Sequence, residues 1–376
     1  MLKKVTIYDV AAISGVSASS VSWVLGGNPR SREISPAVRE KIRNAATKLG
    51  YRRNISAATM RKGVNESTVG LLPGNIDDEL LYMAISEINA NGRGVRIYNN
   101  ADIEETIRDL EDNQINRLLS FNGRQHVDQI LLKYASENNI RMVMVGGEPV
   151  PGFITIRTDE RLAMHQAVEY LYGLGHRKIC LHCGPHRYFS TNERHEGFLQ
   201  ALREFGLDDS PSNVLCEEVS AASLFRFLHE RLPSAICGIY PGWTISIELL
   251  LMKSGLRIPE DISLLSFGNR KGIASGFSVV PVTSLTEQTE EMIHSAVHTL
   301  LELPDAVSKT TLFPASLTVA ESCMPPGPDH VRNIKMAQPR EKWLIVPPGP
   351  LVKSSAKHSK NKKKTYRRSH QNADQK

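Results

Sequence analysis

The most constraining feature of the sequence is a repeated alternation, from about Thr68 onward, between short apolar runs and amphipathic stretches with helical spacing. Strand, helix and strand repeated in this way predict a parallel sheet with helices on both faces. Because the alternation spans roughly 250 residues, more than an ordinary single domain, we expect two such sheets. The candidate strands are residues 68–72, 95–99, 116–121, 141–147, 177–184, 234–240 and 262–268, and the helical stretches include 105–113, 163–175, 195–206 and 243–255.

The composition is that of a globular protein. The 376 residues are 41% hydrophobic and 23% charged, which is ordinary for a globular chain. Five cysteines in a chain of this length do not suggest a disulfide framework. The N-terminus shows no apolar leader with a cleavage site, and no run approaches the roughly 18 apolar residues of a membrane span. We therefore expect a cytoplasmic protein.

The first fifty residues predict three short helices. Thr6 can cap a helix that runs to Ile13, and Gly15 can supply the turn that follows it. Ser35 with Pro36 starts a third helix, whose buried face is Val38, Ile42, Ala45 and Leu49. A small residue, a tight turn and a buried apolar residue are spaced as in a helix-turn-helix, at Ala11, Gly15 and Val21.

The helix between these two lies in the stretch SASSVSWVLGGN, residues 17–28, and carries one of the three tryptophans of the chain. With successive positions about 100° apart, Val21, Val24 and Leu25 form a buried stripe. Ser19 and Trp23 fall together on nearly the opposite side. A tryptophan is therefore expected on the outer face of a short helix.

Charge is distributed unevenly along the chain. Residues 1–64 contain twelve Lys or Arg and three Asp or Glu, a balance of +9, and residues 325–376 contain thirteen and three, a balance of +10. The net charge is +6, so the middle of the chain carries −13. Two basic ends on an acidic body suggest a polyanionic partner, and an ordinary solvated surface is the alternative.

Residues after Cys323 are dominated by proline, lysine and polar side chains, from which no core can form. We expect a disordered basic tail over residues 325–376, with the apolar run WLIV at 343–346 as a candidate docking segment.

Several stretches resemble the LacI/GalR family of repressors. The resemblance covers about residues 5–324, and it is most specific in TIYDVAAISGVSASSVSWVLGG, residues 6–27, and ISPAVREKIRNAATKLGYRRN, residues 34–54. Further matches are VEYLYGLGHRKI (168–179), ERHEGFLQAL (193–202), SGLRIPEDISLLSFGN (254–269) and VTSLTEQTEEM (282–292), the last resembling a short helix that returns to the hinge. The resemblance implies a dimeric transcription factor with a helix-turn-helix headpiece, a hinge helix and a two-lobed core.

The resemblance implies that the second helix enters the major groove and reads bases through Ala18, Ser19 and Trp23. The family usually has arginine where Trp23 stands, and arginine pairs with guanine, whereas tryptophan offers an apolar face and one N–H group. We therefore expect Trp23 to contact thymine methyls or the sugar-phosphate edge of the DNA. The alternative is that Trp23 folds back over the headpiece core or a neighbouring lobe. The complete set of candidate DNA-binding residues is Thr6, Ser17, Ala18, Ser19, Ser22, Trp23, Asn28, Arg52, Asn54, Ala57, Met60 and Arg61.

Residues 52–63 match the family's hinge. Asn54 can cap a helix, and Ala57 and Met60 lie on one face of it. Met60 stands where the family has a leucine that parts a central base step, and methionine can do the same. Ala58 stands where the family commonly has arginine. A plain linker is the alternative.

The resemblance also implies an effector cleft between the lobes, with candidate residues Asp159, Arg194, Tyr240, Trp243 and Asn269. Arg194 is retained, but Glu160 replaces an amide, Tyr240-Pro241 replaces Asn-Asp and Gly268-Asn269 replaces Asp-Asp. An unpaired buried hydroxyl costs roughly 1–3 kcal/mol, so we expect weak or no binding of simple hexoses. Tyr240 and Trp243 suit stacking on a sugar ring or a flatter ligand. Either the ligand differs in chemistry or regulation does not use this cleft.

The sequence does not indicate a metal site or an enzyme. Cys180 and Cys183 of CLHCGPH lie in a candidate strand, where positions i and i+3 face opposite sides, so we expect them in the core. The catalytic motifs of hydrolases, metalloproteases, nucleotide-binding and dinucleotide-binding proteins are not found. We expect no enzymatic activity, no cofactor and no metal.

Together these features predict a sequence-specific transcriptional regulator, most simply a repressor, that binds double-stranded operator DNA as a homodimer. The predicted domains are a helix-turn-helix headpiece (residues 1–51), a hinge (52–64), a two-lobed α/β body that binds a small sugar-like effector (65–324) and the basic tail (325–376). Two alternatives remain: a solute-binding protein of the periplasmic sugar-binding type, and a ligand-independent DNA-binding protein with a vestigial cleft.

Overall fold

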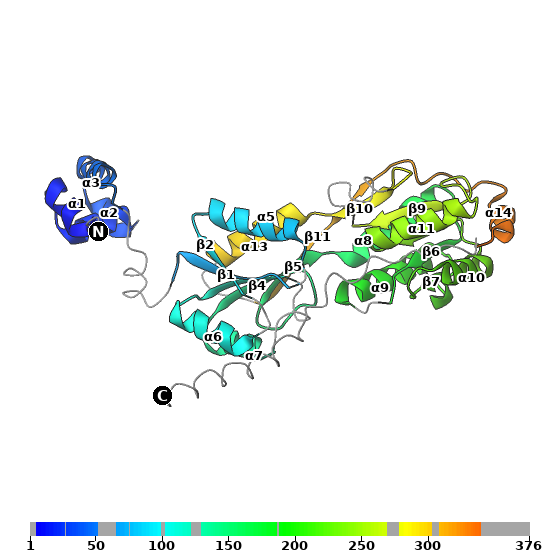
Figure 1. Ribbon diagram of the computed structural model, residues 1–376, viewed down its shortest axis with the longest axis horizontal. Helices are drawn as coiled ribbons and strands as arrows, with labels where there is room; N and C mark the ends of the chain where they lie inside the picture. Colours follow the sequence, from blue (N-terminus) through cyan, green and yellow to red (C-terminus); the bar gives the residue numbers. More distant parts are fainter. Residues whose placement is uncertain are drawn as a thin grey trace, which may run out of the picture.

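The computed structural model describes residues 5–26, 28–51, 65–74, 76–98, 102–121, 129–185, 188–268, 278–302 and 308–339. The chain begins with a headpiece of three helices, α1 (Ile7–Ser14), α2 (Ala18–Leu25) and α3 (Pro36–Leu49), with the short 3-10 helix η1 (Pro29–Glu33) before α3. A body of two α/β lobes follows (Figure 1). The predicted fold class is confirmed.

The first lobe is built on a six-stranded parallel sheet with the order β11-β5-β4-β3-β1-β2. Helices α5 and α13 cover one face of this sheet, and α6 and α7 cover the other. Its strands are β1 (Thr68–Leu72), β2 (Gly94–Ile97), β3 (Arg117–Phe121), β4 (Arg141–Val145), β5 (Ile154–Thr158) and β11 (Lys309–Phe313), and its helices are α5 (Asp78–Ala90), α6 (Ile103–Asp112), α7 (Gln129–Glu137) and α13 (Thr289–Glu302).

The second lobe repeats this arrangement with the strand order β12-β10-β9-β8-β6-β7, in which only the β10–β12 pair is antiparallel. Helices α8 and α9 cover one face, and α10, α11 and α14 cover the other. The strands are β6 (Ile179–His182), β7 (Val214–Leu215), β8 (Ala235–Gly238), β9 (Ser263–Phe267), β10 (Thr283–Glu287) and β12 (Ala315–Thr318). The other elements are α8 (Glu160–Gly173), α9 (Phe189–Glu204), η3 (Pro211–Asn213), α10 (Ala221–Arg231), α11 (Pro241–Lys253) and α14 (His330–Met336).

The chain passes between the lobes three times. The crossovers run from β5 into α8, from β10 into α13 and from β11 into β12. Each takes only a few residues, so side chains near Thr158, Glu287 and Phe313 lie at the junction of the two sheets. At this junction the backbone N–H of Asp159 donates to the carbonyl of Phe313 over 2.7 Å, joining the first and third crossovers.

The seven predicted strands and the predicted helical stretches all form, with ends shifted by a few residues. The run 282–292 differs from its expectation of a short helix. Residues Thr283–Glu287 form β10, and only from Thr289 does the chain become helical. The reason is its place in the sheet: β10 pairs with β9 on one side and β12 on the other, and its first three side chains are buried. Strands β5, β7, β11 and β12 were also absent from the prediction.

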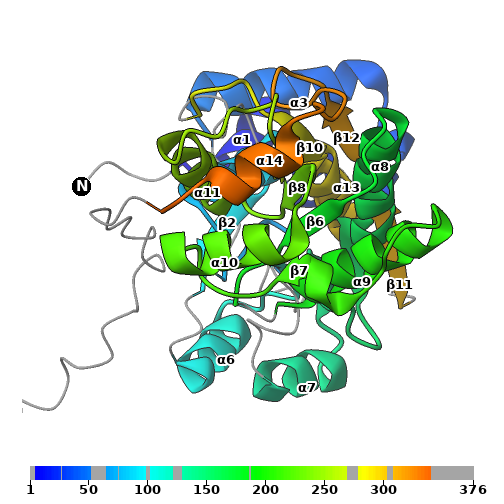
Figure 2. The same cartoon turned by 90° about the vertical axis from the view of Figure 1, so that its right-hand side faces the viewer.

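The expectation of disorder from residue 325 is wrong for residues 325–339. These residues cross the second lobe and form α14, which lies against α10 and α11 (Figure 2). Ile334 is fully buried, and the side-chain amide of Asn333 donates to Asp261 Oδ1 over 2.7 Å. Ile334 and Ala337 both pack into the core beside α10 and α11, and together with this hydrogen bond they hold the segment against the lobe. Residues 340–376, which include the WLIV run, lie outside the described residues.

Candidate DNA-binding face and interlobe site

The headpiece has its own core, and this core fixes the orientation of α2. Its fully or nearly buried side chains are Val10, Val21, Val24, Ile42, Ala45 and Ala46. Gly15 closes α1 with a φ of +67°, a conformation that glycine adopts without strain. The turn after Gly15 sets α2 across α1 and α3, so the predicted helix-turn-helix is present.

The exposed face of α2 carries the predicted base-reading residues. Val21 and Val24 point into the core, as the helical spacing predicted, and Ser19 is exposed. Trp23 is partly exposed and does not belong to the headpiece core formed by the described residues. Instead the guanidinium carbon of Arg30 lies 5.6 Å from the centre of its ring. Trp23 and Arg30 together therefore form one cationic and aromatic surface beside Ser19.

Other predicted DNA-binding residues take part in capping. Ser17 Oγ accepts the backbone N–H of Ser20 over 3.1 Å, and Asn28 Oδ1 accepts that of Arg30 over 2.9 Å. Thr6 donates its N–H and its hydroxyl to Asp9 Oδ2, each over 2.7 Å. These three polar side chains are exposed at helix ends, where backbone N–H groups favour phosphate oxygens. Ala18 and Ser22 are half-buried, and Arg52, Asn54, Ala57, Met60 and Arg61 lie outside the described residues.

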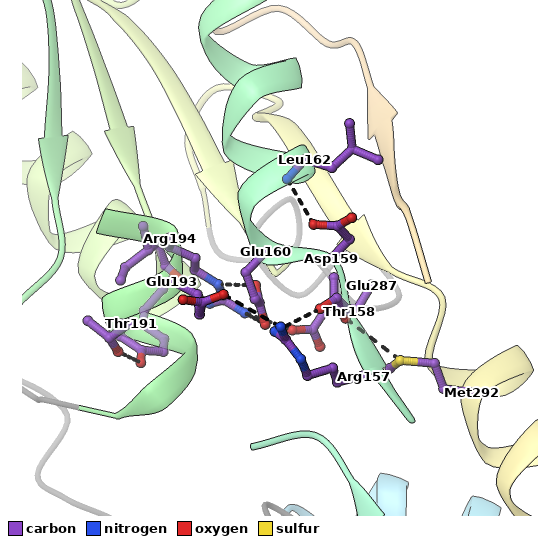
Figure 3. Close-up of polar contacts among 12 residues, drawn as sticks. Arg157, Thr158, Asp159, Glu160, Leu162, Thr191, Glu193, Arg194, Glu287 and Met292 are labelled. Atoms are coloured by element: carbon purple, nitrogen blue, oxygen red, sulfur yellow. Dashed lines mark hydrogen bonds and ion pairs between the residues drawn. The ribbon is translucent and has the colours of Figure 1, made fainter. Parts of the chain in front are cut away.

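The interlobe junction contains a buried ionic cluster centred on Arg194 (Figure 3). Arg194, on α9, donates to Glu160 through Nε over 2.6 Å and through Nη2 over 3.3 Å. Nη2 also donates to Glu287 Oε1 over 2.9 Å, and Nη1 donates to the carbonyl of Ile239 over 3.0 Å. The guanidinium carbon lies 3.6 Å from the centre of the Phe267 ring. The residue expected to hold an effector is thus extensively bonded within the protein.

The partners of Arg194 come from the crossovers. Glu160 begins α8 after the first crossover, and Glu287 ends β10 before the second. The Glu160 side chain is 7% exposed and that of Glu287 28% exposed, so only Glu287 retains appreciable access to solvent. One guanidinium and two carboxylates carry a formal charge of −1. We call Arg194, Glu160 and Glu287 the interlobe triad.

Burial raises the pKa of Glu160 to about 7, and the carboxylate of Glu287 acts in the same direction. Arg194 and Arg157 oppose the shift by favouring the ionised form, but the desolvation of a carboxylate within the lobe outweighs them. The triad therefore contains a carboxyl group that titrates near neutral pH.

A second ionic cluster lies beside the triad (Figure 3). Glu193 accepts from Arg161 Nε over 3.2 Å and Nη2 over 2.9 Å, and Arg157 Nη2 lies 3.5 Å from Glu193 Oε2. Helices α8 and α9 approach closely here, because a Cβ atom at Gly197 would lie 2.7 Å from the Cα atom of Arg161. The close helix contact brings the charged side chains of both helices to the same junction.

The structure separates the predicted effector residues. Asp159 caps α8 by accepting the N–H of Leu162 over 3.0 Å. Tyr240 lies near Arg194 and shares a hydrogen bond of 2.6 Å with Thr191, whereas Trp243 packs edge-on against His182 on the other face of the sheet. Tyr240 and Trp243 therefore do not form one stacking surface. Asn269 lies outside the described residues.

Sequence reasoning missed several members of the junction, among them Arg157, Arg161 and Glu193 of the second ionic cluster. Glu287 was expected in a short helix, and Thr191 had no assigned role. Glu160 and Arg194 lie on two different helices, and no pattern in the sequence near either residue predicted that they would pair. Cys180 and Cys183, in contrast, are buried in different clusters on opposite faces of the sheet, as the strand period predicted.

Comparison with known proteins places these two parts in known families. The model for bacterial regulatory proteins of the lacI family matches residues 6–54, and the periplasmic binding protein-like domain matches residues 168–323. A sucrose operon repressor of Shigella flexneri is 26% identical over 301 residues, 74% of this chain and 88% of the relative. The repressor PurR of Haemophilus influenzae is 24% identical over 310 residues, 79% and 90% of the two chains.

Solved structures share the fold. The lac repressor dimer bound to operator and the anti-inducer ONPF superposes with a TM-score of 0.63 at 23% identity, over 86% of this chain and all of that one. The regulator CelR in complex with cellobiose gives 0.57 at 22% identity, over 85% and 100%. No helix within the described ranges is long and apolar enough to cross a membrane.

A helix-turn-helix headpiece joined to a two-lobed body of the periplasmic-binding-protein type defines a class of DNA-binding transcriptional regulators. Within that class, residues 6–54 are a helix-turn-helix domain of the lacI family of bacterial regulatory proteins, and the two relatives named above are repressors.

Proposed function

We propose that this protein is a transcriptional repressor that acts in the cytoplasm and binds a pseudo-palindromic operator as a homodimer. The observation that carries the proposal is the exposed face of α2. Its inner side supplies Val21 and Val24 to the core, while Ser19 and Trp23 are presented outward with Arg30 beside them. A short helix with this division suits the major groove.

The dimer follows from the single recognition helix of each chain. One such helix reads only a half-site, and two-fold symmetric operators are read by two copies. The lac repressor that shares this fold was solved as a dimer on its operator. The proposed hinge residues Asn54, Ala57, Met60 and Arg61 would meet those of the second copy at the centre of the operator.

Selection of binding sites from random duplex DNA tests this proposal. We expect enriched sequences with two inverted half-sites and one dimer bound to each duplex. Ala18, Ser19 and Trp23 favour apolar contacts to thymine over pairing with guanine, so thymines should be enriched within the half-sites. Asymmetric sites bound by a single chain would contradict the proposal.

For the interlobe junction we propose that simple free hexoses are not effectors. Relatives with this fold were solved with cellobiose and with sucrose. In the present chain, Arg194 already donates to Glu160, Glu287 and Ile239. A hexose hydroxyl would have to displace a charge-assisted hydrogen bond, which is stronger than the bond to a neutral hydroxyl that replaces it.

Two effector schemes agree with this arrangement. An effector of different chemistry binds at the junction, or the protein regulates through DNA binding alone, with the triad filling the place of a ligand. The extensive internal bonding of Arg194 favours the second scheme. Calorimetric titration with monosaccharides, sugar phosphates and purines distinguishes the two schemes, because only the first predicts that a small molecule binds. Micromolar binding of an ordinary hexose, lost in Arg194→Lys, would contradict the proposal for hexoses.

The proposed role is binding and not catalysis. A solute-binding protein of the periplasmic type would share the body, but it would have no use for a basic helix-turn-helix headpiece. Failure of the full chain to retain any duplex DNA at low salt, together with tight binding of a solute, would favour that alternative.

A further inference from the structure

The carboxyl ends of β6 and β7 bring two cysteines together. The strands pair in parallel, with Leu181 opposite Val214 and His182 opposite Leu215. The ladder continues one step further, because the N–H of Cys183 donates to the carbonyl of Leu215 over 3.0 Å. Cys183 and Cys216 are the next residues of the two strands, and their Sγ atoms lie 2.9 Å apart. At this distance the two sulfurs are not joined to each other, because the S–S bond of a disulfide is about 2.0 Å long.

The surroundings give the two thiols different access to solvent. Cys183 is 1% exposed and lies in the core beneath α8 and α9. Cys216 is half-buried at the end of β7, which is the edge strand of its sheet. A small oxidant in solution can therefore reach Cys216, while Cys183 is shielded from it and in contact with Cys216.

The backbone is compatible with a bond between them. Neighbouring strands lie about 4.8 Å apart, and the Cα atoms of a disulfide lie about 4.4–6.8 Å apart. Adjacent residues of paired strands thus meet the Cα requirement, and the two sulfurs, 2.9 Å apart, need to approach by about 0.9 Å to form the bond.

We propose that Cys183 and Cys216 are a peroxide-sensitive modification site that forms a reversible disulfide. The Cys216 thiolate attacks one oxygen of hydrogen peroxide, breaking the O–O bond and giving a sulfenic acid and hydroxide, which takes up the thiol proton as water. The Cys183 sulfur then attacks the sulfenic sulfur, and the departing hydroxide takes the Cys183 proton as a second water. Two thiols lose two electrons in total, and one peroxide becomes two waters. A dithiol reverses the bond by exchange.

The bond would affect the segment that leads to the interlobe triad. After Cys183 the chain continues through Gly184, at a φ of +66°, toward α9, which carries Arg194. A Cβ atom at Gly184 would lie 3.4 Å from Trp243 Nε1, so little free space remains around this turn. The disulfide would tie the edge strand to this turn and restrict its movement. The site is independent of the proposed DNA-binding role.

Treatment of the folded full chain with hydrogen peroxide tests the proposal. After unreacted thiols are alkylated, peptide mass spectrometry should find residues 183 and 216 in one cross-linked pair, lighter by two hydrogens than the two reduced peptides. Dithiothreitol should restore both thiols. The oxidised protein should also unfold at a higher temperature than the reduced protein, since the bond restricts the unfolded chain.

Matched variants complete the test. Cys216→Ser should abolish the crosslink and leave Cys183 available for alkylation after unfolding. Cys323→Ser changes the other half-buried cysteine and should leave the crosslink intact. A wild-type chain that accumulates sulfinic acid at Cys216 with a reduced Cys183, that keeps both thiols reduced, or that crosslinks another pair of cysteines would overturn the proposal.

Discussion

Arg194 and Glu160 form a nearly fully buried ion pair in which Nε and Oε2 are 2.6 Å apart, and this pair ties helix α9 to the first crossover between the lobes. Glu287 adds the second crossover to the same guanidinium. A residue position that the family resemblance assigned to ligand binding is thus used here to hold the junction of the lobes together.

Removal of Arg194 should destabilise the body strongly. Arg194→Ala leaves the carboxylates of Glu160 and Glu287 close together without their cation, and breaking a buried pair in this way costs about 3–5 kcal/mol. The free energy of unfolding is measured by urea denaturation. Arg203→Ala is the control, because Arg203 lies on the same helix and pairs with Asp209 at the surface. Exposed ion pairs of this kind contribute about 0–1 kcal/mol to the free energy of unfolding. Equal stability of the two variants would refute a structural role for the triad.

The protonation of Glu160 should make stability depend on pH. Burial raises its pKa from 4.5 to about 7, so between these values the folded protein retains a proton that the unfolded chain has lost. The contribution of Glu160 to the free energy of unfolding therefore falls as the pH rises from 4.5 to 7. Glu160→Gln removes this titration.

The measurement is the difference in unfolding free energy between wild type and Glu160→Gln across this pH range. Burial also lowers the pKa of His176 and His182 to about 4. Below pH 6.5 the unfolded chain therefore binds protons that the folded protein does not, and the free energy of unfolding falls. Both histidines remain in both proteins, and the difference cancels their effect. We expect the difference to fall by about 3 kcal/mol, at about 1.4 kcal/mol per pKa unit. A flat difference would show that folding does not raise the pKa of Glu160.

Trp23→Arg should change the preferred base at one position of each half-site. Arginine at this position can donate two hydrogen bonds to guanine, which tryptophan cannot do. The change should be visible when both proteins select sites from the same random duplex library. Asn44→Arg adds the same charge on the exposed side of α3 and should leave the base preference unchanged. An unaltered preference for Trp23→Arg would place Trp23 away from the base edges.

The basic residues after α14 should increase affinity for any DNA. Residues 340–376 contain eleven Lys or Arg and two Asp or Glu, a balance of +9. Their deletion should weaken binding and reduce the steepness with which log K falls with log salt, because fewer counterions are released. Discrimination between operators should survive, since phosphate contacts carry no sequence information. An unchanged salt slope would exclude contact of this segment with DNA.

Helix α14 should contribute to the stability of the second lobe. Ile334 is fully buried, whereas Met336, two residues further on, is 67% exposed. Ile334→Ala should cost about 2–5 kcal/mol, and Met336→Ala, on the same helix, should cost less than about 0.5 kcal/mol. Urea denaturation of both variants measures the contrast. Similar losses would mean that the burial of Ile334 contributes little.

The sequence by itself determined the fold class and the headpiece. The alternation of apolar runs and helical stretches predicted two parallel sheets, because strand and helix periods are local properties of the chain. Thr6, Gly15 and Ser35 marked helix ends for the same reason: caps depend on residues within a few positions of the backbone groups that they satisfy.

Only the tertiary structure decided the composition of the interlobe triad. Glu160, Arg194 and Glu287 lie on three separate segments, and their pairing depends on how three crossovers meet between two sheets. Strand β10 depended on its neighbours in the same way. Its sequence alone suggested a short helix, and it is a strand because it pairs with β9 on one side and β12 on the other. The ordering of α14 required a core that distant residues build. Interactions between segments far apart in the chain leave no local pattern, and for that reason the sequence did not predict them.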